Sequence, residues 1–352
     1  MRRELCLAVA AAASLAVASP AAANVVYIPL GPAGTILIVD ANRDAAIGRI
    51  EGVPAVHGLA ATPDGRFLIA GSYEERATGE ASPPRPQAVG EEEHAAHHAK
   101  PPADAKRAAA VVSTVSIIST HDNAVVRRID VPGAVHHVAA SPDGRMAVVT
   151  HPNEGTVTAI DLRNYSIATI ATGSLPNYAV FSPDGRRLFV SNAGNGTVSD
   201  INIDRWIVLR NMIVGKGPEH VVLSKDGSRL YVNNVDGGTV SVVATDQGEV
   251  VRTFPVGTTL HGIDLSDDGK TLFVAALGDN KLAAIDLASG NSREARLAPA
   301  PYHVAVVRGR GRIYVSSANE PIVWVVDPMA LTVSGEIKIG GKGHQMVLGP
   351  GS

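Results

Sequence analysis

Histidine is the residue type of this sequence whose spacing could support chemistry. The chain contains twelve histidines, and a recurring phrase of fifteen residues carries one at the same position in five of seven copies. That position lies seven residues before an aspartate or its equivalent, and it is occupied by His57, His136, Asn177, Glu219, His261, His303 and His344. Neutral imidazole is a ligand of Zn²⁺, Cu²⁺ and Ni²⁺. A fold that gathered these positions would therefore create a transition-metal site.

Three further histidines lie close to the repeated position. Two of them follow it by one residue, and the third stands eight residues after the aspartate of its own copy, where other copies carry serine or asparagine. The predicted metal ligands are therefore His57, His136, His137, His151, His220, His261, His303 and His344. Duplication of a structural histidine is the competing interpretation for the repeated position, but it does not explain the three that lie off it.

The stretch from 74 to 110 departs from the repeat. It holds five prolines and six glutamates and little apolar surface, so we expect a disordered insertion. His94, His97 and His98 would share one face of a helix, and they form a predicted accessory metal loop. A solvated polar linker whose histidines have no role is the alternative.

The repeat also predicts the elements that position the histidines. Successive copies begin 79, 41, 42, 42, 42 and 41 residues apart, and the long first interval contains the insertion. Each copy reads as two short strands around a tight turn such as Ser182-Pro183-Asp184-Gly185, in which glycine takes a conformation that other residues avoid. Two more strands rich in valine and isoleucine follow each pair. Four strands in one repeat are typical of a propeller blade.

Counting the copies predicts an all-β fold, a seven-bladed β-propeller of four-stranded blades. The seventh copy is cut short at the C-terminus, and three strands near 25–27, 35–39 and 46–50 would complete its blade as 1 + 3 strands. Such closure removes exposed sheet edges. The repeated position starts each innermost strand, so we expect the predicted ligands at one end of the central channel. The turn aspartates Asp64, Asp143, Asp184 and Asp226 would lie at the other end, as turn formers.

The amino-acid sequence of the repeat resembles that of a known family. The phrases SPDG, LFVSN, LYVNN and TVSVV are similar to the YVTN family of β-propeller repeats, and the similarity covers 24–352 apart from the insertion. The resemblance implies an exported seven-bladed propeller. It implies little about chemistry, because propellers serve in binding, scaffolding and catalysis alike.

Residues 1–23 predict a signal peptide. Arg2 and Arg3 precede an uncharged apolar run that is too short to span a bilayer, so we expect a periplasmic or secreted protein with one domain at 24–352 and no membrane span. The single cysteine, Cys6, leaves with the signal, which excludes thiolate ligands. With Lys+Arg 31 and Asp+Glu 34, no basic excess favours nucleic acid. We expect a monomer that is open to a periplasmic protein partner.

Three functions fit these observations. The first is a non-catalytic exported protein that holds copper or zinc, or a metal-bearing partner, at the channel. The second is a hydrolase similar to the seven-bladed lactonases, in which Glu219 orients His220 as a general base. The third is a metal-free interaction scaffold. Covalent acyl chemistry has no obvious nucleophile, because the sequence has no Gly-x-Ser-x-Gly elbow and the mature chain no cysteine.

Overall fold

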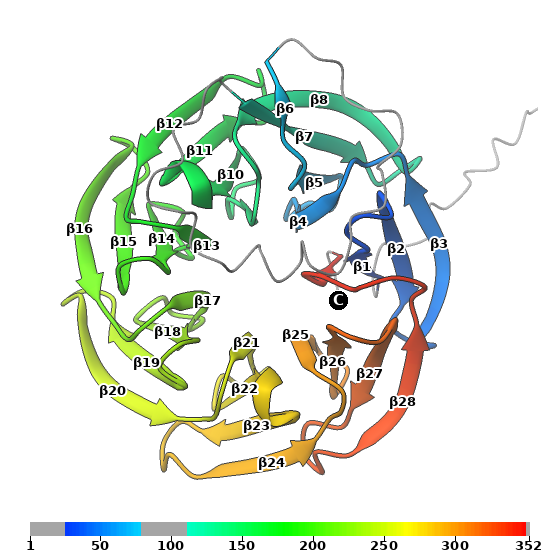
Figure 1. The fold of residues 1–352 in the computed structure, drawn as a ribbon, viewed down its shortest axis with the longest axis vertical. Helices are drawn as coiled ribbons and strands as arrows, with labels where there is room; N and C mark the ends of the chain where they lie inside the picture. The colour runs from blue at the N-terminus through cyan, green and yellow to red at the C-terminus, as the bar shows by residue number, and fades with distance from the viewer. Residues whose placement is uncertain (1–24, 79–110, 350–352) are drawn as a thin grey trace, which may run out of the picture.

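Seven antiparallel sheets stand around a central axis in the computed structural model, which describes residues 25–78 and 111–349 (Figure 1). The fold is therefore the predicted all-β, seven-bladed propeller. We number the blades from the sheet that contains His57. Within each blade the first strand lies nearest the axis and the last lies at the rim, and the sheet of the blade that contains His57 has a fifth, short strand.

The bounds of the strands follow the repeat. Blade 1 contains β4 (Val56–Ala61), β5 (Phe67–Ser72), β6 (Arg76–Ala77), β7 (Val111–Ser119) and β8 (Ala124–Pro132). Blade 2 contains β9 (Val138–Ala140), β10 (Met146–His151), β11 (Thr156–Asp161) and β12 (Ile167–Ala171). Blade 3 contains β13 (Pro176–Phe181), β14 (Arg187–Asn192), β15 (Thr197–Asn202) and β16 (Ile207–Ile213). Blades 4 and 5 contain β17 (Pro218–Leu223), β18 (Arg229–Asn234), β19 (Thr239–Ala244) and β20 (Glu249–Pro255); and β21 (Leu260–Leu265), β22 (Thr271–Ala276), β23 (Lys281–Asp286) and β24 (Ser292–Arg296). Blades 6 and 7 contain β25 (Pro301–Val307), β26 (Arg312–Ser317), β27 (Ile322–Val326) and β28 (Val333–Lys338); and β29 (Val347–Leu348), β1 (Val25–Pro29), β2 (Thr35–Asp40) and β3 (Ala45–Glu51). Two short 3₁₀ turns are η1 (Pro152–Glu154) and η2 (Leu277–Asp279).

Blade 7 closes the ring as predicted, with one strand from the C-terminus and three from the N-terminal end of the described chain. Strand β29 pairs with β1 through Val26 opposite Leu348 and Tyr27 opposite Val347. The Gly349 N–H adds a bond of 2.7 Å to the Val25 carbonyl oxygen. The two ends of the described chain therefore hold each other in one sheet.

In blades 1 to 5 the turn between the first and second strands forms for the predicted reasons. In blade 2 the Asp143 carboxylate accepts hydrogen bonds from the Ser141 hydroxyl, at 2.6 Å, and from the Arg145 N–H, at 3.0 Å. Gly144 follows with φ +68°, the left-handed region that glycine adopts without strain. The aspartate is thus engaged in forming the turn, at the far end of the inner strand from the histidine.

The apolar side chains pack between neighbouring blades. Phe189 of blade 3, for example, lies in one cluster with Leu230 and Val232 of blade 4. Because both faces of the middle strands are covered in this way, these strands read as runs of valine, isoleucine and leucine. The packing fixes the angle between blades and hence where each inner strand begins.

The insertion is partly described. Arg76–Ala77 forms β6, which pairs with Val111 and Val112 at the start of β7, so residues 74–78 of the predicted insertion are ordered, and the rest of it, 79–110, lies outside the described residues. The signal peptide predicted at 1–23 and the predicted accessory ligands His94, His97 and His98 lie outside the described residues. Within 25–78 and 111–349, the structure contains no helix that is long and apolar enough to cross a membrane.

Candidate functional site: the histidine belt

Imidazole rings line the axis of the propeller at the ends where the inner strands begin. His57 of blade 1 lies with its ring centroid 4.6 Å from that of His136 of blade 2 and 4.5 Å from that of His344 of blade 7. The His344 ring centroid lies 6.2 Å from that of His303 of blade 6, which in turn lies 4.7 Å from that of His261 of blade 5. We call the imidazole rings around the axis, together with the rings that contact them, the histidine belt. The sequence placed these five residues at one channel end, and the structure brings them into contact.

The tightest part of the belt is formed by three consecutive blades. His220, His261 and His303 each offer one ring nitrogen, and these three atoms all lie within 4.8 Å of one another. All three side chains are buried. Their ring centroids are separated by 4.1 Å between His220 and His261 and by 5.1 Å between His220 and His303. We call these residues the histidine triad.

Backbone hydrogen bonds fix the tautomers of two other belt members. The Nδ1–H of His57 donates to the carbonyl oxygen of His136 at 2.8 Å, and the Nδ1–H of His136 donates to that of Asn177 at 3.3 Å. In each neutral ring the proton is then on Nδ1, so Nε2 carries the lone pair. A metal-ligating histidine shows this same outer-shell bond. His57 and His136, two of the predicted ligands, lie outside the triad.

His137 has the opposite tautomer. Its Nδ1 accepts a hydrogen bond of 3.1 Å from the backbone N–H of Ala179, so the proton of the neutral ring is on Nε2. The ring stacks on Tyr178, with centroids 3.4 Å apart and planes inclined by 27°. A nitrogen that already carries a proton cannot ligate a metal unless the ring becomes an imidazolate. We therefore interpret His137 as a hydrogen-bond donor and not as the ligand that the sequence predicts.

His151 lies apart from the belt. It is the last residue of β10, and its two ring nitrogens lie 3.2 Å from the Ala134 carbonyl oxygen and 2.9 Å from the Thr158 hydroxyl. It is completely buried between strands of its own blade. Both nitrogens are therefore within hydrogen-bond distance of oxygens of the fold, and the structure does not bring this predicted ligand to the other seven.

Burial and mutual repulsion keep His137 and His303 uncharged. Burial lowers the pKa of His303 well below 6.5, and the neighbouring imidazoles lower it further. The pKa of His137 is lowered in the same way by burial and by His220 and His57. On the acidic side, burial and then the charge of Glu219 raise the pKa of the Tyr302 hydroxyl far above 10. His137, His303 and the Tyr302 hydroxyl are therefore uncharged near neutral pH.

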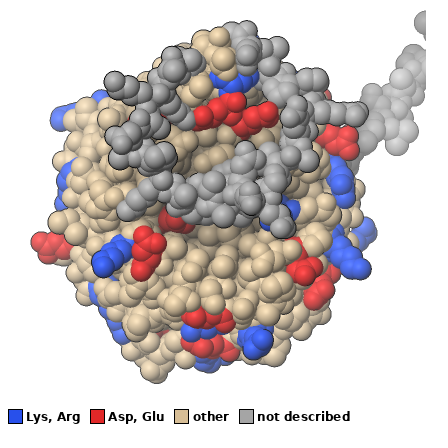
Figure 2. All heavy atoms as spheres, in the orientation of Figure 1, with Lys and Arg blue, Asp and Glu red and all other residues tan. Residues whose placement is uncertain are grey.

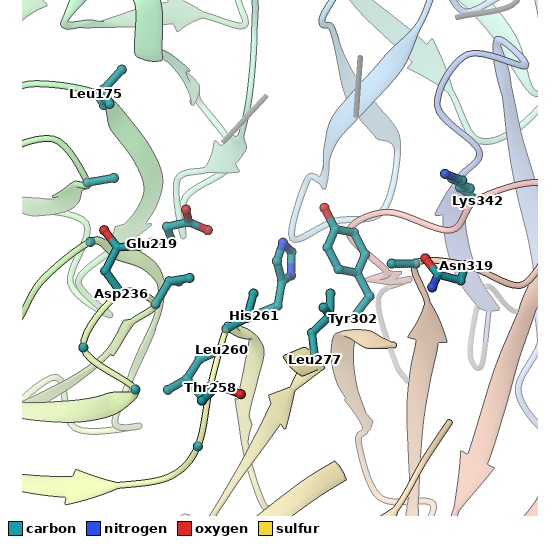
Figure 3. Close-up of a pocket in the computed structure, with 18 residues that line it drawn as sticks. Leu175, Glu219, Asp236, Thr258, Leu260, His261, Leu277, Tyr302, Asn319 and Lys342 are labelled. Atoms are coloured by element: carbon teal, nitrogen blue, oxygen red, sulfur yellow. The ribbon is translucent and has the colours of Figure 1, made fainter. Parts of the chain in front are cut away.

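A cavity of about 1010 Å³ opens beside the belt (Figure 3). His261 and Tyr302, whose rings stack with centroids 3.6 Å apart, stand in its wall between Glu219 on one side and Lys342 on the other. Loops of blades 3 to 6 supply further parts of the wall, which include Leu175, Gly217, Asp236, Gly237, Gly238, Gly257, Thr258, Thr259 and Asn319. One member of the triad is therefore accessible from a space large enough for an organic ligand.

Charged side chains surround this end of the molecule without forming one basic surface. On the face shown in Figure 2, acidic and basic groups of the described residues are intermixed. The distribution agrees with the near balance of charges in the sequence.

The aromatic members of the belt, Tyr178 and Tyr302, were not predicted from the sequence. Tyr178 stacks on His137 and lies 4.8 Å from His220 between ring centroids, while Tyr302 stacks on His261. A signal was present, because Tyr178 follows the repeated position by one residue, as His137 and His220 do in their own copies. An aromatic residue in a position shared with two histidines could have marked it as a belt member.

The fold and the belt define a seven-bladed propeller with a histidine-lined channel. A model of the family described as "Lactonase, 7-bladed beta-propeller" matches residues 147–337, more than half of the chain, and the chain belongs to this family. No curated protein sequence matches the chain.

Solved structures share the fold at low sequence identity. Hydrazine synthase of Kuenenia stuttgartiensis is 17% identical with a TM-score of 0.66, and the match covers 87% of this chain and 95% of that one. A functionally unknown protein from Desulfotomaculum acetoxidans is 13% identical with a TM-score of 0.69, and covers 94% and 100%. Dihydro-heme d1 dehydrogenase NirN in complex with DHE is 15% identical with a TM-score of 0.63, and covers 90% and 64%.

Proposed function

We propose that this protein binds a divalent transition-metal ion, Zn²⁺ or Cu²⁺, through His220, His261 and His303. The observation that carries the proposal is the triad itself, three buried imidazoles on consecutive blades with their nitrogens within 4.8 Å of one another. Imidazole suits both ions, and three protein ligands leave a coordination position open for an exogenous ligand.

The electrostatics of the triad support this assignment. The Nε2 of His303 is buried and has no hydrogen-bond partner among the described residues. Because the pKa of His303 is lowered, that ring is neutral at pH 7 and no proton has to be displaced before it ligates. A buried imidazole nitrogen without a partner is costly, and a metal ion would offset that cost.

Metal titration tests the proposal. Protein dialysed against a chelator should take up one equivalent of Zn²⁺ or Cu²⁺ in competition with a chromophoric chelator. His220→Asn, His261→Asn and His303→Asn should each weaken that uptake by about a hundredfold or more, since each removes one of three ligands. His121→Asn is the matched control, because His121 is exposed in the turn between β7 and β8.

The titration also has outcomes that exclude the triad. Wild-type protein that takes up neither ion would contradict metal binding. Uptake that survives all three triad substitutions would place the metal elsewhere. Deletion of residues 79–110, which removes the predicted accessory ligands, should leave the single equivalent in place if the triad supplies the ligand set.

A lactonase-like hydrolase is the second candidate, supported by the family and by the cavity that Glu219 and His261 line. In this proposal Glu219 acts as a general base on a water molecule that attacks a cyclic ester. Glu219→Gln removes the base with little change in volume. Hydrolysis of a lactone panel that is abolished by this substitution and unaffected by chelator would favour this function over metal binding.

A further inference from the structure

We infer that Asn233 is a positioning residue of the proposed metal site, and that its amide sets the separation between His220 and His261. The inference rests on the proposed function, because it concerns the geometry of the same triad. It gives a role to a buried side chain that is not one of the three ligands and does not line the cavity.

Asn233 connects two members of the triad across a blade boundary. It follows Val232 on β18, and Val232 pairs with Val221 of β17, the residue after His220. The Nδ2–H of Asn233 donates to the backbone carbonyl oxygen of His261 in blade 5 at 2.5 Å, and Asn233 is completely buried. A side chain anchored beside one ligand therefore holds the backbone of the next.

The ring of His261 is held on a second side. It stacks on Tyr302, with centroids 3.6 Å apart and planes inclined by 30°, and its centroid lies 4.1 Å from that of His220. Because one ring face is already packed, the separation of the two imidazoles depends on where the Asn233 amide places the His261 backbone. Contacts that orient a metal ligand in this way change the affinity of a site for its metal.

Other blades have a hydroxyl at the position of Asn233. In blade 2 the Thr150 hydroxyl donates to the Asn177 carbonyl oxygen of blade 3 at 2.8 Å and accepts from the His137 N–H of its own blade at 3.0 Å. Ser191 makes the same pair of bonds in blade 3. In these blades the hydroxyl thus ties the second strand to the inner strand of its own blade and to that of the next.

Asn233 makes only one of these two bonds. Its Oδ1 is buried and has no hydrogen-bond partner among residues 25–78 and 111–349. A buried acceptor without a donor is destabilising, so the amide has a cost that a serine would avoid. The amide nitrogen, however, lies one bond further from the backbone than a serine hydroxyl does. A departure from a repeated local rule is expected where function requires it, and here it falls between two ligands of the triad.

The second boundary within the triad, between blades 5 and 6, is held differently. Its residue equivalent to Asn233 is Ala275, which has no side-chain donor. Further along the inner strands, the Oδ2 of Asp264 accepts from the Val306 N–H of blade 6 at 2.8 Å. A change at Asn233 should therefore alter one ligand separation and leave the other in place.

Two substitutions test the amide. Asn233→Ala removes the donor. Asn233→Ser introduces the residue of blade 3, which can bond to both inner strands but holds His261 from a shorter side chain. Thr150→Ala is the matched control, because it breaks the same kind of bond at a boundary where the residue held is Asn177, which is not a member of the triad.

The experiment compares metal affinity with stability in these three variants and the wild type. Zn²⁺ and Cu²⁺ are titrated separately, in competition with a chromophoric chelator. Asn233→Ala and Asn233→Ser should each bind the ion about tenfold more weakly than the wild type, whereas Thr150→Ala should stay within about twofold. In denaturant unfolding without metal, Asn233→Ser should be at least as stable as the wild type and Thr150→Ala less stable. A purely structural role for Asn233 predicts no loss of affinity in Asn233→Ser.

The other outcomes overturn distinct statements. Wild-type metal affinity in Asn233→Ser would overturn the positioning role and leave the metal site standing, and this variant decides the question if Asn233→Ala does not fold. An equal loss of affinity in Thr150→Ala would show that any weakened blade boundary lowers the affinity, and would also overturn the role of Asn233. A wild type that takes up neither ion would overturn the proposed function and the inference with it.

Discussion

His151 and Asn192 occupy the same position in successive blades and perform the same structural task. The Nε2 of His151 bonds to the Thr158 hydroxyl at 2.9 Å, and the Nδ2 of Asn192 bonds to the Ser199 hydroxyl at 2.9 Å, seven residues further along in both cases. Asn234 repeats the arrangement in blade 4, with Ser241 as its partner at 2.9 Å. The last residue of each of these second strands thus ties its strand to the third.

Substitution of His151 should follow this equivalence. His151→Ala leaves the Thr158 hydroxyl and the Ala134 carbonyl without their buried partner, and should lower the free energy of unfolding by about 1–3 kcal/mol. His151→Asn places the residue of blades 3 and 4 at this point and should recover most of that loss. Denaturant unfolding measures both. Metal uptake that fell in either folded variant would contradict the structural role.

Acid should destabilise the protein through the same side chain. Burial lowers the pKa of His151 from 6.5 to about 4, so the folded state favours the neutral ring. Between these two values the unfolded chain binds the proton more readily. The contribution of His151 is therefore complete above pH 6.5 and is lost as the pH falls toward 4.

The pH effect can be isolated with a matched variant. Between pH 7 and pH 4.5 the wild type should lose about 2 kcal/mol more unfolding free energy than His151→Asn, which has no ionisable group there. Other buried histidines contribute to both proteins and cancel in the difference. Parallel losses in the two proteins would show that His151 is not held neutral by the fold.

The architecture could be predicted because the repeat encodes it locally. A turn such as Ser141 to Gly144 specifies its own hydrogen bonds and its left-handed glycine, and the spacing of the copies fixes the number of blades. The convergence of His57, His261 and His303 follows from the topology alone, since every inner strand begins at the axis.

The choice among the histidines could not be predicted. His137 and His220 share one repeat position, yet a hydrogen bond from Ala179 engages the Nδ1 of the first while the second faces His261. His151 lies at the correct end of its strand, but its side chain turns between strands rather than to the axis. Ring orientation depends on contacts between blades, which a one-dimensional pattern does not contain.

An arginine of each of three outer strands ties its blade to the next. The Arg252 guanidinium donates to the carbonyl oxygens of Leu287 and Ala288 at 2.9 and 3.1 Å, and it lies 4.5 Å above the Phe254 ring. Arg210 and Arg293 make corresponding bonds to the turns of blades 4 and 6. These contacts orient neighbouring blades at the rim.

Loss of this contact should loosen one blade boundary. Arg252→Ala should lower the free energy of unfolding by about 1 kcal/mol, a modest effect because the guanidinium is solvent-exposed. Arg252→Lys should recover little, since an ammonium cannot reproduce the forked donors. Arg296→Ala is the control, as the Arg296 side chain is exposed and its guanidinium makes none of the inter-blade hydrogen bonds of the described residues. Similar stabilities for Arg252→Ala and Arg296→Ala would show that the Arg252 guanidinium does not stabilise the contact between blades 4 and 5.

Closure of the ring depends on packing as well as on the pairing of β29 with β1. Met346 precedes β29, is 8% exposed and belongs to a cluster that includes Val26 and Ile28 of β1 and Ile339 of the preceding segment. Met329 lies in the turn after β27 and is 79% exposed. The two methionines therefore provide the same chemical change in buried and exposed surroundings.

Truncation of these methionines tests whether the C-terminal segment closes the ring. Met346→Ala should lower the free energy of unfolding by about 2–3 kcal/mol, because it leaves a cavity between β29 and its neighbours, whereas Met329→Ala should change it by less than about 0.5 kcal/mol. Hydrogen exchange adds a local readout: the Gly349 amide, bonded to Val25, should exchange faster in Met346→Ala alone. If Met346→Ala unfolds with wild-type stability and unchanged Gly349 exchange, the C-terminal strand contributes little to closure, and the ring must be held by the blade interfaces.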